Sequence, residues 1–202
     1  MIDKNRVPLI RFKGFSGEWK ARSLIELGDI VTGSTPSTHK SKYYANKGMP
    51  WVTPTDISEN TTFQSAKYLT EEGQKVARVV PQNTILVTSI ASIGKNTILG
   101  KKGSFNQQIN GLVPNIKENN PYFLFTESVF WSNKMKNTAA SGTMQIVNKK
   151  EFSELKTYVP NIFEQTKIGN LFQKLDKLID LQQKEIKKLK NIKKASLEKM
   201  FV

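Results

Sequence analysis

The strongest periodic pattern of apolar residues lies between residues 161 and 202. This segment contains no proline, and most of its residues favour helices. Apolar side chains recur three or four positions apart, and one polar residue, Gln182, occupies a place in the series. The main row consists of Phe172, Leu175, Ile179, Ile186 and Leu189, and the adjacent row of Leu171, Leu178, Glu185 and Ile192. The pattern predicts one long amphipathic α-helix, with a stripe wider than the seam of a two-stranded coiled coil.

Three residues mark the start of this helix. Pro160 is unfavourable inside a helix, Asn161 can cap the first turn, and Glu164 follows at the capping-box position. A straight helix of about 38 residues is about 57 Å long. We expect it to project beyond its domain, so that its apolar stripe needs a partner helix. The alternative is a helix that folds back onto its own domain.

Residues 1–160 show a different pattern, in which short β-prone runs alternate with turns. The runs lie at 30–32, 51–53, 84–88, 97–99 and 111–113. Helix signals occur at 70–77 and 122–136. We therefore predict an α+β protein, with a mixed α/β domain over residues 1–160 followed by one long C-terminal α-helix over residues 161–202.

The charge of the chain indicates what these elements bind. The 202 residues include 31 Lys and Arg against 17 Asp and Glu, which gives a formal net charge of +14. Self-repulsion at this charge opposes folding, and contact with nucleic-acid phosphates is a common reason for it. Nucleic acid is therefore the expected partner. The alternative is a solvated basic surface in a Lys-rich organism, because most of the basic residues are Lys.

Other features of the composition exclude several classes of protein. Without cysteine there is no disulfide, no thiolate zinc site and no cysteine nucleophile. A single histidine, His39, excludes a paired-His metal site and disfavours a Ser-His-Asp triad. The N-terminal apolar run, Val7–Ile10, is too short for a signal peptide, and no run approaches the ~20 residues of a membrane span. We expect no membrane partner and a cytoplasmic location.

Three fragments resemble catalytic motifs but are incomplete. Asn120–Tyr122 lacks the second proline of the Asn-Pro-Pro-Tyr motif of amino-methyltransferases. The pair Gly94–Lys95 lacks the first glycine and the final Ser or Thr of a phosphate-binding loop. Glu154–Lys156 lacks the Pro-Asp pair that precedes this fragment in metal-dependent nucleases. The sequence therefore predicts binding rather than catalysis, with no catalytic residue and no metal site.

Four polar clusters are candidates for contact with nucleic acid. The loop at 33–44 combines hydroxyls, cations and aromatic rings, which suit phosphates, sugars and bases. Its candidates are Ser37, Thr38, His39, Lys40, Lys42, Tyr43 and Tyr44. The second and fourth clusters, at 89–96 and 141–145, contain Ser92 and Lys95, and Thr143 and Gln145. The third consists of carboxamides of the kind that read adenine, namely Asn106, Gln107 and Gln108.

Two of these clusters also have a purely structural interpretation. The loop at 33–44 is also compatible with a Ser/Thr-rich turn in which Tyr43 or Tyr44 belongs to the core. The carboxamides at 106–108 are equally compatible with a network of backbone hydrogen bonds at the start of a strand. The sequence leaves these alternatives open.

Taken together, these residues resemble the DNA-specificity (S) subunit of type I restriction-modification systems. The matching fragments are short, but they follow the order of the family and cover nearly the whole chain. They are Val7–Phe12, Gly17–Trp19, Gly28–Ile30, Gly33–Pro36, Tyr43–Tyr44, Pro50–Val52, Ser92–Lys95, Asn106–Gln107, Gly142–Gln145, Pro160 with Glu164, Gln165 and Ile168, and Lys199–Phe201.

The resemblance implies that residues 1–160 are a non-catalytic target-recognition domain that reads double-stranded DNA. In this family each recognition domain reads one half of a bipartite site. The long helices set the spacing of the halves and dock the methyltransferase (M) subunits, while a separate restriction (R) subunit cuts DNA. S-adenosylmethionine, ATP and magnesium are accordingly expected in the partner subunits, and no cofactor is expected in this chain.

The chain departs from the family in its domain number. A usual S subunit has two recognition domains and two helical regions, whereas this sequence has one of each, as a natural half subunit or as a truncated form. We expect a homodimer whose helices pair as an antiparallel coiled coil and which reads a palindromic, interrupted site. The expected helix contacts are Leu171, Phe172, Leu175, Leu178, Ile179, Gln182, Ile186 and Leu189. The rival functions are a nucleic-acid enzyme that acts alone and a basic coiled-coil scaffold.

Overall fold

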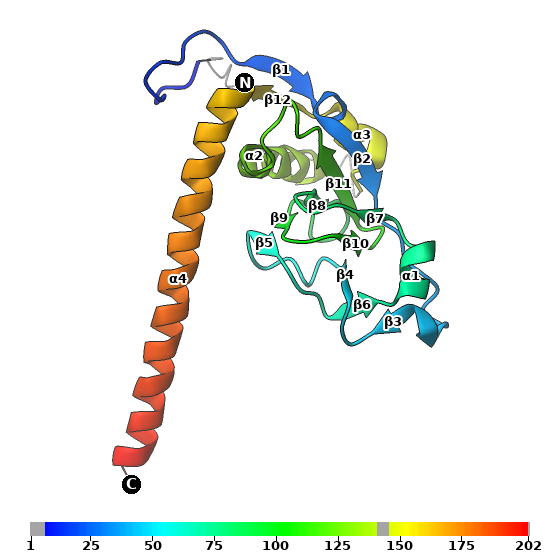
Figure 1. Ribbon diagram of the computed structural model, residues 1–202, viewed down its shortest axis with the longest axis vertical. Helices are drawn as coiled ribbons and strands as arrows, with labels where there is room; N and C mark the ends of the chain where they lie inside the picture. Colours follow the sequence, from blue (N-terminus) through cyan, green and yellow to red (C-terminus); the bar gives the residue numbers. More distant parts are fainter. Residues whose placement is uncertain (1–6, 141–145, 202) are drawn as a thin grey trace.

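The computed structural model describes residues 7–140 and 146–201 (Figure 1). The strands are β1 (Lys20–Ser23), β2 (Gly28–Thr32), β3 (Tyr44–Ala45), β4 (Met49–Val52), β5 (Thr61–Thr62), β6 (Lys67–Leu69), β7 (Val79–Val80), β8 (Ile85–Thr88), β9 (Asn96–Leu99), β10 (Gly103–Phe105), β11 (Ile109–Pro114) and β12 (Lys156–Val159). The helices are α1 (Glu71–Val76), α2 (Pro121–Ala140), α3 (Lys149–Glu154) and α4 (Ile162–Met200), with 3₁₀ turns η1 (Leu24–Glu26) and η2 (Ser41–Tyr43).

A sheet with the strand order β2-β11-β8-β9-β5 forms the middle of the globular part. Its central strand, β8, is buried along its whole length. Ile85 and Val87 pack in one cluster with Phe123 and Trp131 of α2, whereas Leu86 belongs to a cluster on the other face. Successive side chains of a strand point to opposite faces, so both faces of this sheet are covered.

The second sheet, with the order β3-β6-β4-β10-β7, covers the face of the central sheet that α2 leaves free. Val52 and Phe105 of this sheet share a core cluster with Leu86 and Ile109 of the central sheet. The short turn at 106–108 leads from β10 in one sheet directly to β11 in the other. The globular part is therefore layered as α2, central sheet and second sheet.

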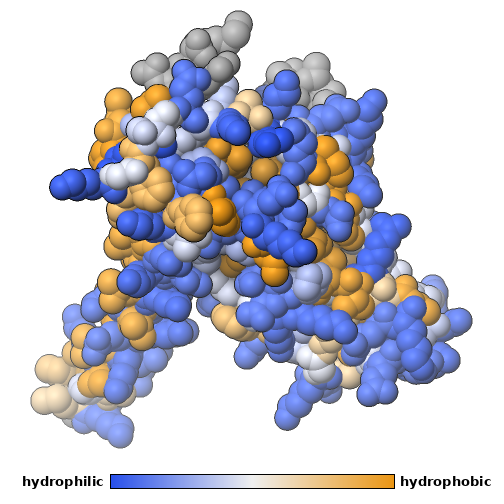
Figure 2. Space-filling model, turned by 45° about the horizontal axis from the view of Figure 1, so that its top comes forward, coloured by the Kyte–Doolittle hydropathy of each residue, from blue (hydrophilic) through white to orange (hydrophobic). Residues whose placement is uncertain are grey.

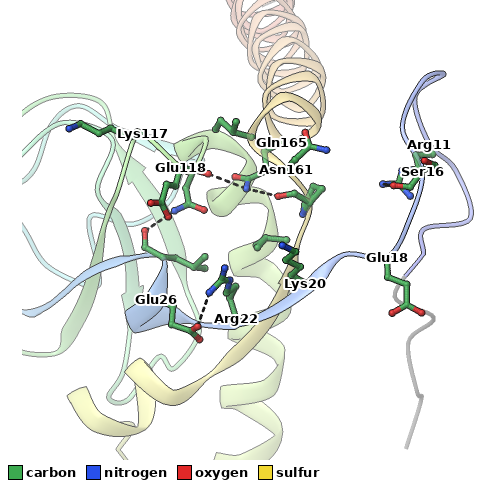
Figure 3. A pocket seen from close by; sticks show the side chains of 15 residues that line it. Arg11, Ser16, Glu18, Lys20, Arg22, Glu26, Lys117, Glu118, Asn161 and Gln165 are labelled. Carbon is green, nitrogen blue, oxygen red and sulfur yellow. Dashed lines mark hydrogen bonds and ion pairs between the residues drawn. The ribbon is translucent and has the colours of Figure 1, made fainter.

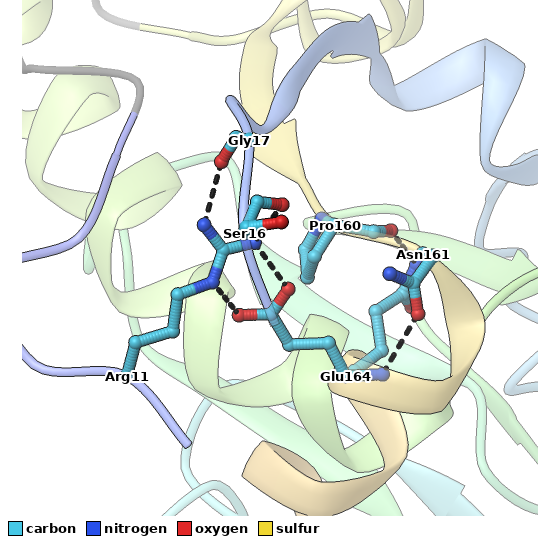
Figure 4. A network of polar contacts seen from close by, with 7 residues as sticks. Arg11, Ser16, Gly17, Pro160, Asn161 and Glu164 are labelled. Carbon is cyan, nitrogen blue, oxygen red and sulfur yellow. Dashed lines mark hydrogen bonds and ion pairs between the residues drawn. The ribbon is translucent and has the colours of Figure 1, made fainter. Parts of the chain in front are cut away.

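An N-terminal arm, residues 7–17, lies against the start of α4. Both oxygens of Glu164 accept hydrogen bonds from Arg11, from Nε at 2.7 Å and from Nη2 at 2.7 Å (Figure 4). The side chain of Glu164 has no exposed surface, so this pair is buried on its acidic side. Nζ of Lys167 lies 5.6 Å from the centre of the Phe15 ring. These contacts hold the arm beside the first two turns of the helix.

The long helix starts as the sequence predicts. Asn161 is the N-cap, and its side chain accepts a hydrogen bond from the backbone N–H of Glu164 at 3.0 Å. The first turns then pack on α2: Gln165 accepts a hydrogen bond from the backbone N–H of Asn120 at 3.0 Å. Tyr122 donates a hydrogen bond from its hydroxyl to Asp176 at 2.6 Å. These contacts set the direction in which α4 leaves the globular part.

Beyond these turns α4 projects away from the globular part (Figure 1). Every residue from Lys177 to Phe201 is exposed. The alternative in which the helix folds back onto its own domain is therefore wrong. In the part of the chain that the structure describes, no helix combines the length and the apolar character that a membrane crossing requires.

The secondary structure follows the sequence pattern closely. The five β-prone runs overlap β2, β4, β8, β9 and β11, and the two helix signals correspond to α1 and α2. Thr70 caps α1 by accepting a hydrogen bond from the backbone N–H of Gly73. The α+β class and the long C-terminal helix are confirmed. The pairing of that helix as a coiled coil stays a prediction, as does the division into domains at residue 160.

Candidate nucleic-acid interface

The register of the central sheet brings the ends of four strands together. β11 runs antiparallel to both β2 and β8, and β9 runs antiparallel to β8. The last residue of β2 lies opposite Asn110, the last residue of β8 opposite Ile109, and the first residue of β9 opposite Val87. The loops that leave these strand ends therefore meet at one end of the sheet. They are the loops that carry the predicted clusters.

Hydrogen bonds join the first three clusters into one surface. The hydroxyl of Thr35, in the loop at 33–44, donates to the side-chain oxygen of Gln107. The carbonyl oxygen of Gln108 accepts from the backbone N–H of Ser89 at 2.8 Å and from its hydroxyl at 3.0 Å. Residues separated by more than fifty positions in the sequence are therefore neighbours in space. We call this surface, formed by the loops at 33–44, 89–96 and 106–108, the loop face.

The chain after the fourth cluster also reaches the loop face. Ile146 forms a β-bridge with Ile90, and the backbone N–H of Val147 donates to the carbonyl of Ser89 at 3.0 Å. Thr143 and Gln145, the candidates of the fourth cluster, lie outside the described residues.

The loop at 33–44 presents most of its candidate side chains to solvent. Ser37, Thr38, His39, Lys40 and Lys42 are exposed. Nζ of Lys40 and Nζ of Lys42 each lie 5.7 Å from the centre of the Tyr43 ring, which is half-buried. Two cations beside one aromatic ring suit contact with a phosphate and the adjoining sugar or base.

Tyr44 has a different environment from Tyr43. Its hydroxyl donates to the carbonyl of Pro36 at 2.6 Å, and its ring meets Trp51 edge-on at 5.7 Å between centres. Trp51 in turn donates from its indole N–H to the carbonyl of Ser34 at 3.0 Å. Burial raises the pKa of Tyr44 above its ordinary value. Tyr44 therefore helps to hold the loop at 33–44 in place, while the Tyr43 ring lies beside Lys40 and Lys42.

The carboxamide cluster divides in the same way. Asn106 is buried, and its amide donates to the side-chain oxygen of Gln108 at 3.0 Å. The backbone N–H of Gln108 donates back to the side-chain oxygen of Asn106 at 3.1 Å. These two side chains hold the turn, in agreement with the structural interpretation. Gln107 is exposed at the tip of the turn.

The loop at 89–96 is a tight turn that presents one lysine. Thr88 accepts a hydrogen bond at its hydroxyl from the backbone N–H of Lys95 at 2.9 Å and donates one to the carbonyl of Ser92. Gly94 has a φ of +82° and is buried; a side chain there would meet the backbone oxygen of Ser132 on α2. Ser92 is half-buried, and Lys95 is exposed. The turn therefore holds the backbone of Lys95 in place, while the side chain remains exposed.

Two basic residues near the loop face were missed by the sequence analysis. Nζ of Lys67 lies 5.7 Å from the Tyr44 ring centre. Arg78 donates to the carbonyl of Thr32 at 2.7 Å, at the end of β2. Each contact joins residues far apart in the sequence, so only the pairing of β3 with β6 and the turn after α1 could have revealed them. Hydrophilic side chains dominate this lobe, at the lower right of Figure 2.

A mixed-charge cavity lies at the other end of the central sheet. It has a volume of about 400 Å³, and residues of the arm, β1, the loop before α2 and the start of α4 line it (Figure 3). Hydrogen bonds from Ser23, and then from Arg22, hold the pKa of Glu26 at about 2.

Within residues 7–140 and 146–201, no group of three or more His, Cys, Asp or Glu is placed to hold a metal ion. The fragment Asn120–Tyr122 starts α2, where Asn120 accepts from the backbone N–H of Phe123 at 2.9 Å.

The apolar stripe of α4 is uncovered along the projecting part (Figure 2). The exposed fractions of its predicted contact residues range from 40% at Phe172 to 60% at Leu189. Gln182 is exposed between them. A stripe of this length on an otherwise Lys-rich helix is a surface for another helix.

Comparison with known proteins identifies the family. Residues 16–191 match the type I restriction modification DNA specificity domain. The chain belongs to this specificity family. It is 27% identical over 192 residues to the type I restriction enzyme MjaIX specificity subunit of Methanocaldococcus jannaschii, with 92% of this chain and 44% of that protein aligned. It is also 27% identical over 180 residues to the EcoR124I/EcoR124II specificity subunit of Escherichia coli, covering 86% of this chain and 44% of that one.

Solved structures show the same fold. The HsdS subunit from Thermoanaerobacter tengcongensis superposes with a TM-score of 0.63 at 16% identity, over 94% of this chain and 46% of that one. The type I S subunit from M. genitalium gives a TM-score of 0.65 at 20% identity, over 91% and 46%. This chain of the specificity family thus spans less than half the length of the curated relatives and solved structures that it matches.

Proposed function

We propose that this chain is the sequence-reading part of a type I restriction-modification complex. It recognises double-stranded DNA and directs methylation, and restriction, by partner subunits to a bipartite site. The M and R subunits contribute the chemistry that requires S-adenosylmethionine, ATP and magnesium, and this chain contributes no catalytic residue. The observation that carries the proposal is the joining of separate, mostly exposed polar loops into one basic loop face in a member of the specificity family.

The loop face offers two kinds of DNA contact. Lys40, Lys42 and Lys95 are exposed cations that suit phosphates and fix the position of the protein on the duplex. Gln107 is an exposed carboxamide at the tip of a rigid turn, and such a group can hydrogen-bond the major-groove edge of adenine. Asn106 and Gln108 act indirectly, by holding that turn.

We further propose that two copies of this chain pair through α4. The stripe on α4 is exposed along its projecting part, which supports this pairing. Antiparallel pairing of two α4 helices would place two loop faces about a two-fold axis, and such a dimer reads two identical half-sites in inverted orientation. The remaining surface of the helix pair is rich in exposed Lys residues, and it stays available for docking of the M subunits.

Binding of labelled duplex DNA at several salt concentrations tests the DNA contact. Lys42→Ala should weaken binding to all sequences and reduce the slope of log K against log salt by roughly one, because one phosphate contact is lost. Lys117→Ala is the matched control, since Lys117 lies at the opposite end of the central sheet beside the mixed-charge cavity. An unchanged slope in Lys42→Ala would remove this residue from the interface.

Three further measurements test the proposal and its rivals. The purified chain is incubated with DNA and magnesium, with and without a methyl donor; cleavage or methylation by the chain alone would favour the enzyme. Absence of DNA binding at low salt would favour the scaffold. Sedimentation at micromolar concentration tests the dimer, which should have twice the 22.9 kDa mass of the chain; a monomer would contradict it.

A further inference from the structure

Apolar side chains near both ends of α4 are largely exposed in the single chain. On the N-terminal arm, Leu9 is 98% exposed and Ile10 is 92% exposed. At the far end of the helix, Met200 is 75% exposed and Phe201 is 72% exposed, and Leu197 is also exposed. Ile10 adjoins Arg11, which is bonded to Glu164, and Leu197 and Met200 belong to α4.

The arm covers the apolar stripe of α4 where the helix begins. Glu164 lies eighteen residues before Gln182, which is five full turns, so both project from the same face of the helix. Arg11 bonds to the fully buried side chain of Glu164, and Phe15 lies beside Lys167 one turn later. A second helix that follows the stripe toward the globular part therefore ends against the arm.

The register of the helix pair sets how far the second helix reaches. The main row of the stripe divides into two rows with a spacing of seven residues, namely Phe172, Ile179 and Ile186, and Leu175, Gln182 and Leu189. In an antiparallel pair, one row faces the other row of the partner. In the register in which all six residues pair with one another, Phe172 lies opposite Leu189, Leu175 opposite Ile186, and Ile179 opposite Gln182. In this register residues 197–201 of the partner lie opposite residues 160–164.

We propose that the arm of each chain is the docking site for the end of α4 of a second copy. Leu9 and Ile10 of one copy receive Leu197, Met200 and Phe201 of the other, once at each end of the helix pair. This inference rests on the homodimer of the proposed function and adds its register and its end contacts. It also gives the arm a role, because the pair between Arg11 and Glu164 holds the arm in place on the stripe.

Crosslinking tests this contact directly, because the chain has no cysteine. The double variant Ile10→Cys/Met200→Cys, treated with a short bismaleimide reagent, should form a covalent dimer. A link within one chain is excluded, since a 39-residue helix is about 58 Å long and separates the two sites. The single variants are the controls, and neither should crosslink, because like positions lie at opposite ends of the dimer.

The outcomes distinguish failure of the docking site alone from failure of the proposed antiparallel dimer. A dimer in sedimentation without the crosslink overturns the docking site and leaves the homodimer standing. Crosslinking of either single variant indicates parallel helices and overturns both. A monomer also overturns both, while DNA binding by the same sample tests the reading function separately.

A second pair of variants measures the strength of the contact. Leu9→Ser/Ile10→Ser should weaken the dimer at least tenfold and leave the thermal stability of the monomer unchanged, because both side chains are exposed in the single chain. The matched control is Val76→Ser, which changes an exposed residue on α1, far from the helix. Equal dimer affinities for the two variants would overturn the docking site.

Discussion

Glu164 shows at the scale of one residue how the N-terminal arm is attached to α4. Its carboxylate is fully buried, and both oxygens accept hydrogen bonds from Arg11, 153 positions away in the sequence. Arg11 also donates to the carbonyls of Ser16 and Gly17, which closes the arm on itself. A buried carboxylate is tolerated only with such a partner.

We therefore expect that removing Arg11 alone lowers the free energy of unfolding. Arg11→Leu should reduce the free energy of unfolding by about 3 kcal/mol, because it leaves the Glu164 charge buried and unpaired. The double variant Arg11→Leu/Glu164→Leu should lose less than the single variant. Urea unfolding of the three proteins measures both values, and a double variant less stable than Arg11→Leu would contradict this explanation.

The environment of Tyr122 predicts how the stability of the folded protein changes at alkaline pH. Burial, and then the hydrogen bond to Asp176, raises the pKa of Tyr122 in the folded protein. In the unfolded chain a tyrosine loses its proton near pH 10. Above that pH the unfolded state binds fewer protons than the folded state, so the folded state loses stability as pH rises.

The difference between wild type and Tyr122→Phe isolates this contribution. Near neutral pH the variant should be less stable by about 1 kcal/mol, because one hydrogen bond is lost. As pH rises from about 9 to about 11, the gap should shrink, because only the wild type carries this titration. Urea unfolding at a series of pH values gives the result; a constant gap would contradict it.

The residue scale is also where sequence reasoning reached its limit. The sequence located the polar clusters, because composition alone marks a loop rich in Ser, Thr, Lys and Tyr. It could not distinguish Tyr43 from Tyr44, or Gln107 from Gln108, because consecutive residues on either side of a turn have the same composition signal and opposite surroundings.

At the scale of elements, periodicity predicted α4 and its cap, because helix propensity and spacing are local properties. The two-residue strands β3, β5 and β7 could not be predicted in this way, since two residues carry no period. They exist because longer strands of the two sheets lie beside them. The direction of α4 was likewise unpredictable, because it depends on contacts with α2.

Gly169 lies at a close contact between α4 and the start of α2, and its substitution tests the importance of this packing. The residue is buried, and a Cβ there would meet the side-chain oxygen of Asn120 and, at 2.9 Å, the backbone nitrogen of Phe123. Gly169→Ala should therefore reduce stability by about 1 kcal/mol, although Ala favours a helix by about that amount over Gly.

The neighbouring position is the matched control for this variant. Asn170 is exposed, so Asn170→Ala should change stability by no more than about 0.5 kcal/mol. Thermal unfolding measures both variants. A gain in stability for Gly169→Ala would show that helix propensity outweighs the packing of α4 on α2.

At the scale of the whole molecule, the chain combines a loop face with a projecting rod whose stripe is uncovered. The resemblance seen in the sequence identified the family correctly, because its short motifs fall in order along nearly the whole chain. The assembly could not be derived from the sequence in the same way, because a seam of apolar residues indicates a helix partner without identifying it.

The sequence of the methylated DNA tests this account most directly. The chain is combined with a type I M subunit as its only source of specificity, and the modified bases in a pool of random duplexes are mapped. We predict two identical half-sites in inverted orientation with a fixed spacer. Two different half-sites, a single undivided site, or methylation that does not depend on the chain would contradict the account.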